Sequence, residues 1–322
     1  YAALWHFDRK PWTHTTGSRE GGVWKSVDGG DTWKKLEKGL PKGVVGRIGV
    51  KVAPSNPNIV YVIAESDEGT MFRSTDQGET FEKVSDNVQI VSRGLYYTDM
   101  RVDPADPNRV YAISSRLFLS IDGGKSWERI SRSTHVDYHS LWIDPTNPDR
   151  IWQGQDGGVA VSYDRGKTWE PIRNLPIAQF YQAFHDNREP FYYVGGGLQD
   201  NGTWYGPSRT REPAGILEDD WRMMSFGDAY WVVPHPEIED LFLSESQAGG
   251  IVRTDMRTRQ QIDVSPQPRR FDGGPVEELE YRFNWNAPIV ASPHDPMQIY
   301  FAGNVVFETH DFGDTWERIS PD

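Results

Sequence analysis

Acidic residues recur in the short polar segments that separate the apolar runs of this chain, most of them near glycine or amide residues. Five of them are Asp99, Asp156, Asp200, Asp228 and Glu245. Glycoside hydrolysis uses two carboxylates held roughly 5 to 9.5 Å apart, one of which acts as an acid. Asp156, Asp200, Asp228 and Glu245 are therefore candidate catalytic residues.

Amide and aromatic side chains accompany these acids. Acids, amides and aromatic planes together recognise sugars or peptides, and a neighbouring glycine lets the backbone approach a ligand closely. We predict a ligand site drawn from Asp99, His139, Gln155, Asp156, Tyr181, Gln199, Asp200, Asn201, Asp228, Glu245, Gln247, Trp285, Asn286 and Asn304. The same residue types also form ordinary tight turns, so that role stays open for each of them.

Metal and cofactor chemistry is not indicated. His135 and His139 are four residues apart, which would suit zinc on a helix, but the His-Glu-x-x-His signature is absent. Their segment leads into an expected strand, so a hydrogen-bonding role for His139 is favoured. The chain has no cysteine, P-loop or dinucleotide fingerprint, and we predict no metal and no cofactor.

Composition narrows the class of protein further. The 322 residues carry a net charge of −13, which argues against nucleic acid as a partner because phosphates are bound by Lys and Arg. The longest apolar stretch, 59–64, is far shorter than the roughly 20 residues of a membrane-spanning helix. Aromatic residues make up 13% of the chain, and turn residues are frequent. This combination favours an all-β protein.

An eight-residue motif, Ser-x-Asp-x-Gly-x-Thr-Trp, recurs along the chain, and we call it the Asp-box. Its five aspartates are Asp28, Asp76, Asp122, Asp164 and Asp311. They are 48, 46, 42 and 147 residues apart, so two decayed copies should lie in the last interval. We place these copies around Thr203-Trp-Tyr205 and Arg253-Thr-Asp-Met256. The aspartate should accept backbone N–H bonds within a turn, which indicates a structural role.

The repeats predict both the fold and its boundaries. Each repeat reads as four strands, which are 47–52, 59–64, 70–74 and 80–84 in the second copy. Four antiparallel strands in 40 to 50 residues are typical of a β-propeller blade. We therefore predict one seven-bladed β-propeller over 1–322, with blades at about 1–40, 41–88, 89–132, 133–175, 176–220, 221–275 and 276–322. The first blade lacks its inner strand, so we expect a fragment of a longer chain with further blades.

Blade topology sorts the polar segments by face. Asp-boxes join strands three and four, whereas the candidate ligand residues lie in loops between strands two and three or at entries to strand one. These two kinds of loop share the opposite, top face of a propeller, where ligands commonly bind. We therefore expect the candidate residues to converge there.

The chain resembles the large bacterial Asp-box, or neuraminidase-repeat, proteins that are often labelled glycosyl hydrolases. The phrases that carry the resemblance are Arg9-Lys-Pro-Trp12, Gly46-Arg-Ile-Gly49, Leu141-Trp-Ile-Asp144, Gln179-Phe-Tyr181, Gln199-Asp-Asn201, Arg282-Phe-Asn-Trp-Asn286, Ser292-Pro-His-Asp-Pro296 and Asp311-Phe-Gly-Asp-Thr-Trp316. The chain is more distantly similar to sortilin-type and xyloglucanase propellers. The resemblance implies export and an extracytoplasmic location.

Three functions remain open. The first is a propeller module that binds a carbohydrate or protein partner at its top face. The alternative is a sialidase-like or xyloglucanase-like glycoside hydrolase with paired carboxylates at the channel mouth; Arg47, Arg93, Arg101 and Tyr181 would serve a sialidase-type site. The third is a structural role in a surface assembly, which an exposed patch of Tyr192, Tyr193, Trp204 and Tyr205 would favour.

Overall fold

A computed structural model describes residues 1–10, 13–175, 177–268 and 278–322, so Pro11 and Trp12 of the Arg9–Trp12 phrase lie outside the described residues, as does part of the predicted blade boundary near 275. These residues form eight antiparallel sheets, which makes the protein all-β as predicted. The chain divides into two compact units, 1–175 (unit 1) and 176–322 (unit 2), each described here by itself. The number of blades and their membership in one domain stay predictions of the sequence repeat.

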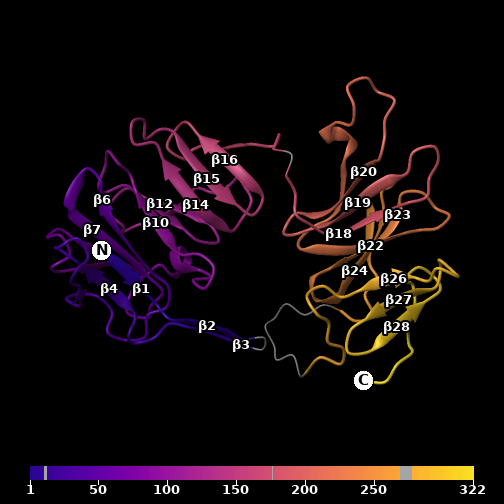
Figure 1. Ribbon diagram of the computed structural model, residues 1–322, viewed down its shortest axis with the longest axis horizontal. Helices are drawn as coiled ribbons and strands as arrows, with labels where there is room; N and C mark the ends of the chain where they lie inside the picture. Colours follow the sequence, from indigo (N-terminus) through magenta and orange to yellow (C-terminus); the bar gives the residue numbers. More distant parts are fainter. Residues whose placement is uncertain (11–12, 176, 269–277) are drawn as a thin grey trace. The chain divides into compact units, whose positions relative to one another are not determined.

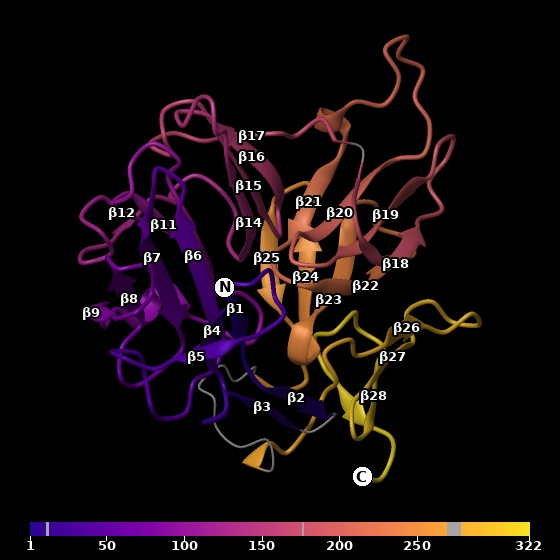
Figure 2. The same cartoon turned by 60° about the vertical axis from the view of Figure 1, so that its left-hand side comes forward.

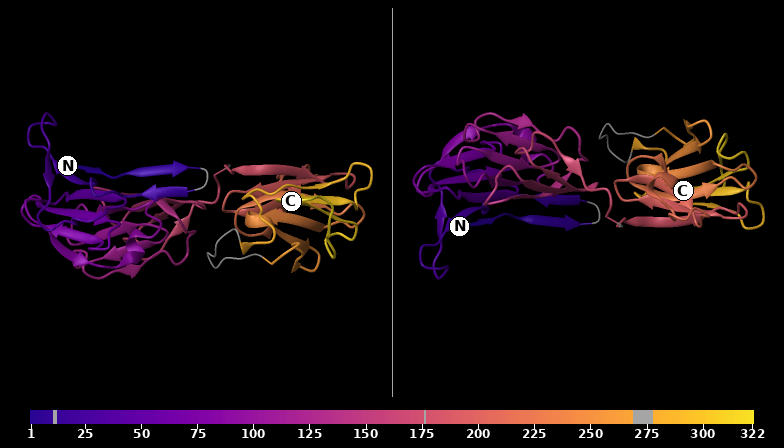
Figure 3. Two further views of the ribbon diagram at one scale, coloured as in Figure 1. Left: turned by 90° about the horizontal axis from the view of Figure 1, so that it is seen from below. Right: turned by 90° about the horizontal axis from the view of Figure 1, so that it is seen from above.

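Unit 1 contains five of these sheets (Figure 1). The first has three strands, β1 (Ala2–Leu4), β4 (Gly22–Lys25) and β5 (Lys34–Leu36), and the hairpin β2 (Phe7–Lys10) and β3 (Thr13–Thr16) projects from it (Figure 3). The other three have four strands each: β6 (Ile48–Ala53), β7 (Asn56–Ala64), β8 (Met71–Ser74), β9 (Glu82–Ser85); β10 (Asp99–Val102), β11 (Val110–Ile113), β12 (Leu117–Ser120), β13 (Glu128–Arg129); β14 (Tyr138–Ile143), β15 (Ile151–Gln155), β16 (Gly158–Ser162), β17 (Glu170–Pro171). A short 3₁₀ helix, η1 (Val88–Val91), precedes β10.

Unit 2 contains three four-stranded sheets (Figure 2). They are β18 (Phe180–His185), β19 (Tyr193–Leu198), β20 (Gly202–Pro207), β21 (Arg222–Ser225); β22 (Ala229–Pro234), β23 (Leu241–Ser246), β24 (Gly250–Asp255), β25 (Gln260–Asp263); and β26 (Ile289–Ala291), β27 (Ile299–Ala302), β28 (Val306–Thr309), β29 (Glu317–Arg318). Two short 3₁₀ helices, η2 (Glu218–Asp220) and η3 (Gln247–Gly249), lie in its connections.

Each four-stranded sheet is a meander in which every strand pairs with the next one along the chain. This is the order that a propeller blade requires. In the second sheet, β6 to β9 match the four predicted strands to within a few residues. The first sheet has three strands in the order β1-β4-β5, as expected for a blade without its inner strand, whereas the inserted hairpin β2–β3 was not predicted.

The cores lie between neighbouring sheets of the same unit. In unit 1, Tyr61 and Ile63 of β7 pack in one fully buried cluster with Met100 of β10 and Val110 of β11. In unit 2, Leu243 and Ile251 are buried with Ile289, Ile299 and Phe301. Residues 59–64 of β7 are all buried, which is why they form one continuous apolar run instead of an alternating one.

The five Asp-box turns repeat the same hydrogen bonds. In each turn the backbone N–H of the Thr or Ser donates to the aspartate Oδ1 at 2.9 to 3.0 Å. The glycine two residues after the aspartate has φ between 80° and 107° in all five turns, a backbone conformation that favours glycine. These contacts bear out the expected turn, and they occupy the carboxylates within the fold.

The two expected decayed copies differ from each other. Asp255 lies at the end of β24, where its Oδ1 accepts from the Arg257 N–H at 2.9 Å, so this turn keeps an aspartate between strands three and four. Thr203-Trp-Tyr205 lies inside strand β20 instead of in a turn, so the placement of that copy was wrong. The connection from β20 to β21 runs over residues 208–221 and includes η2.

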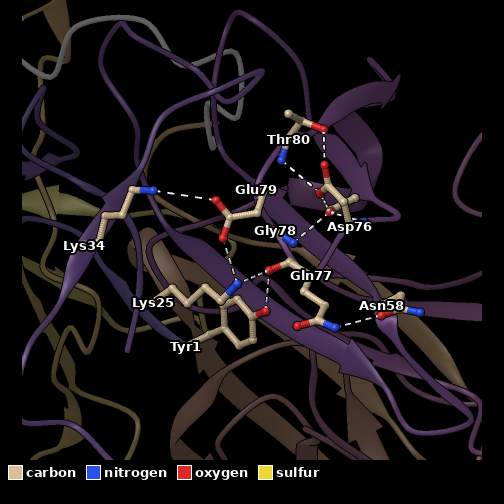
Figure 4. Close-up of polar contacts among 10 residues, drawn as sticks. Tyr1, Lys25, Lys34, Asn58, Asp76, Gln77, Gly78, Glu79 and Thr80 are labelled. Atoms are coloured by element: carbon tan, nitrogen blue, oxygen red, sulfur yellow. Dashed lines mark hydrogen bonds and ion pairs between the residues drawn. The ribbon is translucent and has the colours of Figure 1, made fainter. Parts of the chain in front are cut away.

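Neighbouring sheets of unit 1 are also joined by side chains that reach an Asp-box turn (Figure 4). The backbone oxygen of Gln77, a residue with φ of 60°, accepts from the Tyr1 hydroxyl at 2.6 Å and from Lys25 Nζ at 2.8 Å. Lys25 also pairs with Glu79 at 3.0 Å. Tyr111 makes a similar contact between the β10–β13 and β14–β17 sheets, to the backbone oxygen of Arg165 at 3.2 Å.

Candidate functional site

Three loops of unit 2 meet at Asp228, the residue before strand β22. Its Oδ1 accepts from the Asp200 backbone N–H at 3.0 Å, and its Oδ2 accepts from Trp285 Nε1 at 3.2 Å. Its backbone oxygen accepts from the Gln247 N–H at 3.2 Å. We call Asp200, Asp228 and Trp285 the Asp228 cluster. These residues come from three predicted top-face loops, which therefore converge within unit 2.

Two large aromatic side chains near Asp228 face solvent. The Trp285 residue is 58% exposed although its indole N–H is held by Asp228. Phe226, two residues before Asp228, is 76% exposed. An aromatic ring that is fixed at its edge and open on its surface suits a ligand with an apolar face, such as a sugar ring.

A second pair of contacts lies next to the cluster. Trp231 Nε1 donates to Asn286 Oδ1 at 2.7 Å, which ties the segment after Trp285 to strand β22. The Tyr181 and Tyr230 rings pack with their centroids 4.5 Å apart. Burial, with nearby Asp228, raises the pKa of Tyr230 well above its usual range.

Glu245 is fully buried in strand β23, whereas the sequence placed it in an open loop. Its Oε1 accepts from the Ala287 backbone N–H at 3.3 Å. Burial raises the pKa of Glu245 to about 9, although backbone N–H groups of Ala287 and Trp231 oppose this shift. Glu245 is therefore a neutral carboxylic acid at pH 7, and its burial contradicts its expected place at a channel mouth.

The remaining candidates of unit 2 stabilise the loops. Asn201 Nδ2 donates to the Gln199 backbone oxygen at 2.9 Å, within the turn after β19. Asn304 Oδ1 accepts from the Arg282 N–H at 2.7 Å. Gln247 lies in η3, and its Oε1 would meet a Cβ added at Gly227 at 2.9 Å. These amides flank the Asp228 cluster in sequence or in space.

Two candidate residues of unit 1 are already engaged within the fold, Asp99 in ion pairs and Gln155 in a turn. Asp99 at the start of β10 pairs with Arg101 and, at 3.3 Å, with Lys51. Together these partners hold the pKa of the partly buried Asp99 below its usual range, against the effect of its burial. Gln155 Oε1 accepts from the Gly157 N–H at 2.5 Å, which is turn chemistry.

His139 and Asp156 come together in unit 1. His139 Nε2 lies 2.9 Å from Asp156 Oδ1, and the His139 ring packs edge-on against Tyr97 at 5.0 Å. The favoured hydrogen-bonding role of His139 thus has a partner in Asp156. His135 Nδ1 lies 3.2 Å from the Val136 backbone oxygen. Over the described ranges, no three His, Asp or Glu residues are grouped so as to hold a metal ion.

The four aromatic residues whose exposure would favour a structural assembly do not form an exposed patch. Tyr205 is fully buried, and Tyr193 and Trp204 are partly buried, so Tyr192, at 47% exposure, is the one exposed member of the four. Tyr193 and Tyr205 pack against each other at 5.6 Å, because the long strands β19 and β20 turn these rings toward the core. The four residues therefore do not supply the exposed patch that would favour a structural role.

A cavity of about 500 Å³ lies at the opposite ends of the unit 2 strands, and none of the predicted site residues lines it. Arg188 borders this cavity, where it pairs with Asp186 and Asp240 and lies 4.0 Å from the centre of the Tyr193 ring. Arg188, Asp186 and Asp240 are thus paired with one another at this cavity.

Sequence reasoning missed Phe226, Tyr230 and Trp231 as members of the site. The signal for them was their place: all three lie within three residues of Asp228, at the entry to a first strand. Phe226 is exposed, Tyr230 packs on Tyr181, and Trp231 fixes Asn286. No helix in the described part of the chain is long and apolar enough to span a membrane.

No protein-family model matches the sequence. Xyloglucanase Xgh74A of Acetivibrio thermocellus is 36% identical over 327 residues, which cover 93% of this chain and 36% of that protein. A probable oligoxyloglucan-reducing end-specific xyloglucanase of Neosartorya fischeri is 27% identical over 188 residues, covering 50% of this chain and 22% of the relative. The VPS10 domain-containing receptor SorCS1 of Homo sapiens is 26% identical over 138 residues, covering 40% and 11%.

The chain thus spans about a fifth of the Neosartorya relative and about a third of Xgh74A. Among solved structures, the GH74 enzyme of Niastella koreensis has a TM-score of 0.38 at 16% identity, over 95% of this chain and 48% of that one. PorZ of Porphyromonas gingivalis has a TM-score of 0.41 at 13% identity, over 92% and 38%. The sequence comparisons show that the chain has homologues among xyloglucanases and a sortilin-type receptor.

Proposed function

We propose that this chain is part of an extracytoplasmic glycoside hydrolase that acts on xyloglucan or a related polysaccharide, and that the glycan binds at the Asp228 cluster of unit 2. The observation that carries the proposal is the Trp285 side chain, which is 58% exposed while its indole N–H is fixed by Asp228. A ring held in place before binding loses little freedom when a sugar stacks on it. The identity to Xgh74A over most of the chain supports a glycan as the ligand.

The proposed catalytic carboxylates are Asp200 and Asp228. They are brought together because the Asp200 N–H donates to Asp228 Oδ1, and both side chains are partly exposed. Glycoside hydrolysis needs two such groups on either side of the scissile bond. Asp99, by contrast, is neutralised by Lys51 and Arg101, and Glu245 is out of reach of a substrate.

Binding is tested by calorimetric titration of the chain with xyloglucan oligosaccharides. We expect Trp285→Ala to weaken binding at least about tenfold, which is typical of the loss of a central aromatic contact. Trp33→Ala is the matched control, because Trp33 is also exposed, at 49%, and also donates its indole N–H, to the Gly30 backbone oxygen. Equal binding by both variants, or no binding by the unchanged chain, would overturn the proposed site.

Hydrolysis is tested on the full-length protein by the release of reducing ends from xyloglucan. Asp228→Asn and Asp200→Asn should each reduce the rate at least about a hundredfold if they supply acid and base chemistry. Asp263→Asn on β25, outside the cluster, serves as the control variant. Unchanged rates in both cluster variants would remove Asp200 and Asp228 from the chemistry.

A non-hydrolytic glycan-binding role is the second candidate. The observation that favours it is that both carboxylate oxygens of Asp228 accept hydrogen bonds from the protein itself. A carboxylate used to position Trp285 and the Asp200 turn has less freedom to exchange a proton. Glycan binding by the chain without reducing-end release by the full-length protein would support this role.

A further inference from the structure

Three attachments hold the segment around Trp285 against strands β22 and β23. Asp228 accepts from the Trp285 indole, Asn286 accepts from the Trp231 indole, and Glu245 accepts from the backbone N–H of Ala287. The first two attachments are partly or fully exposed to solvent, whereas Glu245 is completely buried. One buried carboxyl group, that of Glu245, therefore joins strand β23 to the exposed segment around Trp285.

The Glu245 carboxyl has features that a packing residue does not need. Its Oε2 is buried and has no hydrogen-bond partner among the described residues. Its other contacts are backbone N–H groups, of Ala287 and of Trp231. Leaving a buried polar atom unpartnered costs about 1 to 3 kcal/mol, and the hydrogen bonds that Glu245 accepts from the backbone of Ala287 and Trp231 offset this cost.

We infer that Glu245 is a positioning residue for glycan binding: by holding Ala287, it sets the orientation in which the Trp285 ring meets a sugar. The inference rests on the proposed function, because it gives Glu245 its role through Trp285. Glu245 accepts from Trp231 as well, and Trp231 fixes Asn286. One side chain thus joins β22, β23 and the Trp285 segment.

Glu245 accepts these hydrogen bonds as a neutral carboxyl group at pH 7. No cation is among the groups that act on its carboxyl, and burial raises its pKa to about 9. The titratable groups that face it are Tyr230 and, beyond Tyr230, Asp228, both on or next to β22. Ionisation of Glu245 above pH 9 would place a second negative charge near Asp228 and disturb the backbone at Ala287.

The test follows the Trp285 signal by ¹⁹F NMR in protein labelled with 5-fluorotryptophan, with Trp285→Phe used to assign that signal. Glu245→Gln keeps a neutral oxygen acceptor of the same size, so we expect it to leave the Trp285 signal and oligosaccharide binding within about twofold of the unchanged chain. Glu245→Ala should shift and broaden the signal and weaken binding at least about tenfold. Glu308→Ala on β28 is the control and should change neither.

A pH series separates positioning from a purely structural role. In the unchanged chain the Trp285 signal should move as the pH rises through 9, whereas in Glu245→Gln it should not. This comparison stands even if Glu245→Ala does not fold. A Trp285 signal with the same pH response in both proteins would overturn the inference, whether or not glycan binds. Absence of binding together with the expected pH response would instead refute the proposed function and leave the link between Glu245 and Trp285 intact.

Discussion

Units 1 and 2 are built from the same kind of sheet but differ in how regular their turns are. Four of the five Asp-boxes lie in unit 1, at Asp28, Asp76, Asp122 and Asp164. In unit 2, Asp311 keeps the full motif, Asp255 keeps part of it, and β20 is joined to β21 by the long connection 208–221. Unit 2 has therefore lost the regular turn in two of its three sheets.

At the sheet ends opposite the Asp-box turns, the two units differ in the partners of their aspartates. In unit 1, Asp99 is paired with Lys51 and Arg101, and Asp137 is paired with Arg93. In unit 2, Asp228 accepts from neutral donors, a backbone N–H and an indole N–H. Within the described residues, Asp228 thus has no cationic partner of the kind that Asp99 and Asp137 have. The less regular unit is therefore the one in which we propose the ligand site.

The largest expected effect tests the close packing of unit 2. A Cβ added at Gly197 in β19 would lie 2.0 Å from the Ala229 backbone oxygen in β22, the strand that follows Asp228. Because backbone atoms cannot move aside, Gly197→Ala should lower the free energy of unfolding by about 3 kcal/mol or more. Urea denaturation followed by circular dichroism measures this change.

Gly154→Ala in β15 is the matched variant from unit 1, again in the second strand of a sheet. Its new Cβ would meet the hydroxyl of Ser140 at 2.6 Å, and that side chain is exposed and able to rotate. We expect a loss below about 1 kcal/mol. Equal losses for the two glycine variants would contradict a closer packing of the sheets in unit 2.

The next effect compares a complete Asp-box with a decayed one. Asp122 accepts from two backbone N–H groups, of Lys125 and Ser126, and from the hydroxyls of Ser120 and Ser126. Asp122→Ala should therefore cost about 2 kcal/mol, whereas Asp255→Ala, which loses one short backbone hydrogen bond and an ion pair with the exposed Arg257, should cost under about 1 kcal/mol. Thermal unfolding of the two variants measures the difference, and the reverse order would show that the decayed turn has kept its role.

A smaller effect concerns the charge of the same turn. Burial would raise the pKa of Asp122, but hydrogen bonds from Ser126 and Ser120 outweigh it and lower the pKa to about 2. Since the unfolded chain has the ordinary value near 3.8, the ionised form stabilises the fold above pH 4, and this contribution is lost as the pH falls from about 4 to 2. The destabilisation by Asp122→Ala, measured by urea denaturation, should therefore shrink across that range. A constant difference would exclude a contribution from the charge.

Much of the fold followed from local chemistry. The Asp-box fixes a turn through contacts between residues a few positions apart, so Asp76 and its partners predict the junction of β8 and β9 without any knowledge of distant contacts. The apolar run 59–64 likewise predicts a buried strand. The hairpin β2–β3 was missed because its residues are mostly exposed and show no alternation between buried and exposed positions.

The site was predicted less completely. Asp228 and Trp285 were identified because the repeat places both at entries to a first strand, but 57 residues separate them and only the fold brings them together. Glu245 was misjudged for a physical reason: residues 242–246 of β23 are all buried, so the strand has no solvent face toward which an acid would turn. A polar residue next to a predicted loop does not reveal which way its side chain points.

The smallest expected effect concerns the contact between sheets at the Asp76 turn (Figure 4). Lys25 is 14% exposed in its side chain and donates to the Gln77 backbone oxygen as well as pairing with Glu79, whereas Lys34 is 76% exposed and pairs with Glu79 at 3.6 Å. Lys25→Met should cost about 1 kcal/mol, because a neutral oxygen loses a charged donor, and Lys34→Met should cost close to nothing. Thermal unfolding at low and high salt measures both variants. The effect of Lys25→Met should persist at high salt because a hydrogen bond to the neutral Gln77 oxygen is screened less by salt than an ion pair is. Its disappearance at high salt would mean that the sheets of unit 1 are joined at this turn by surface charge alone.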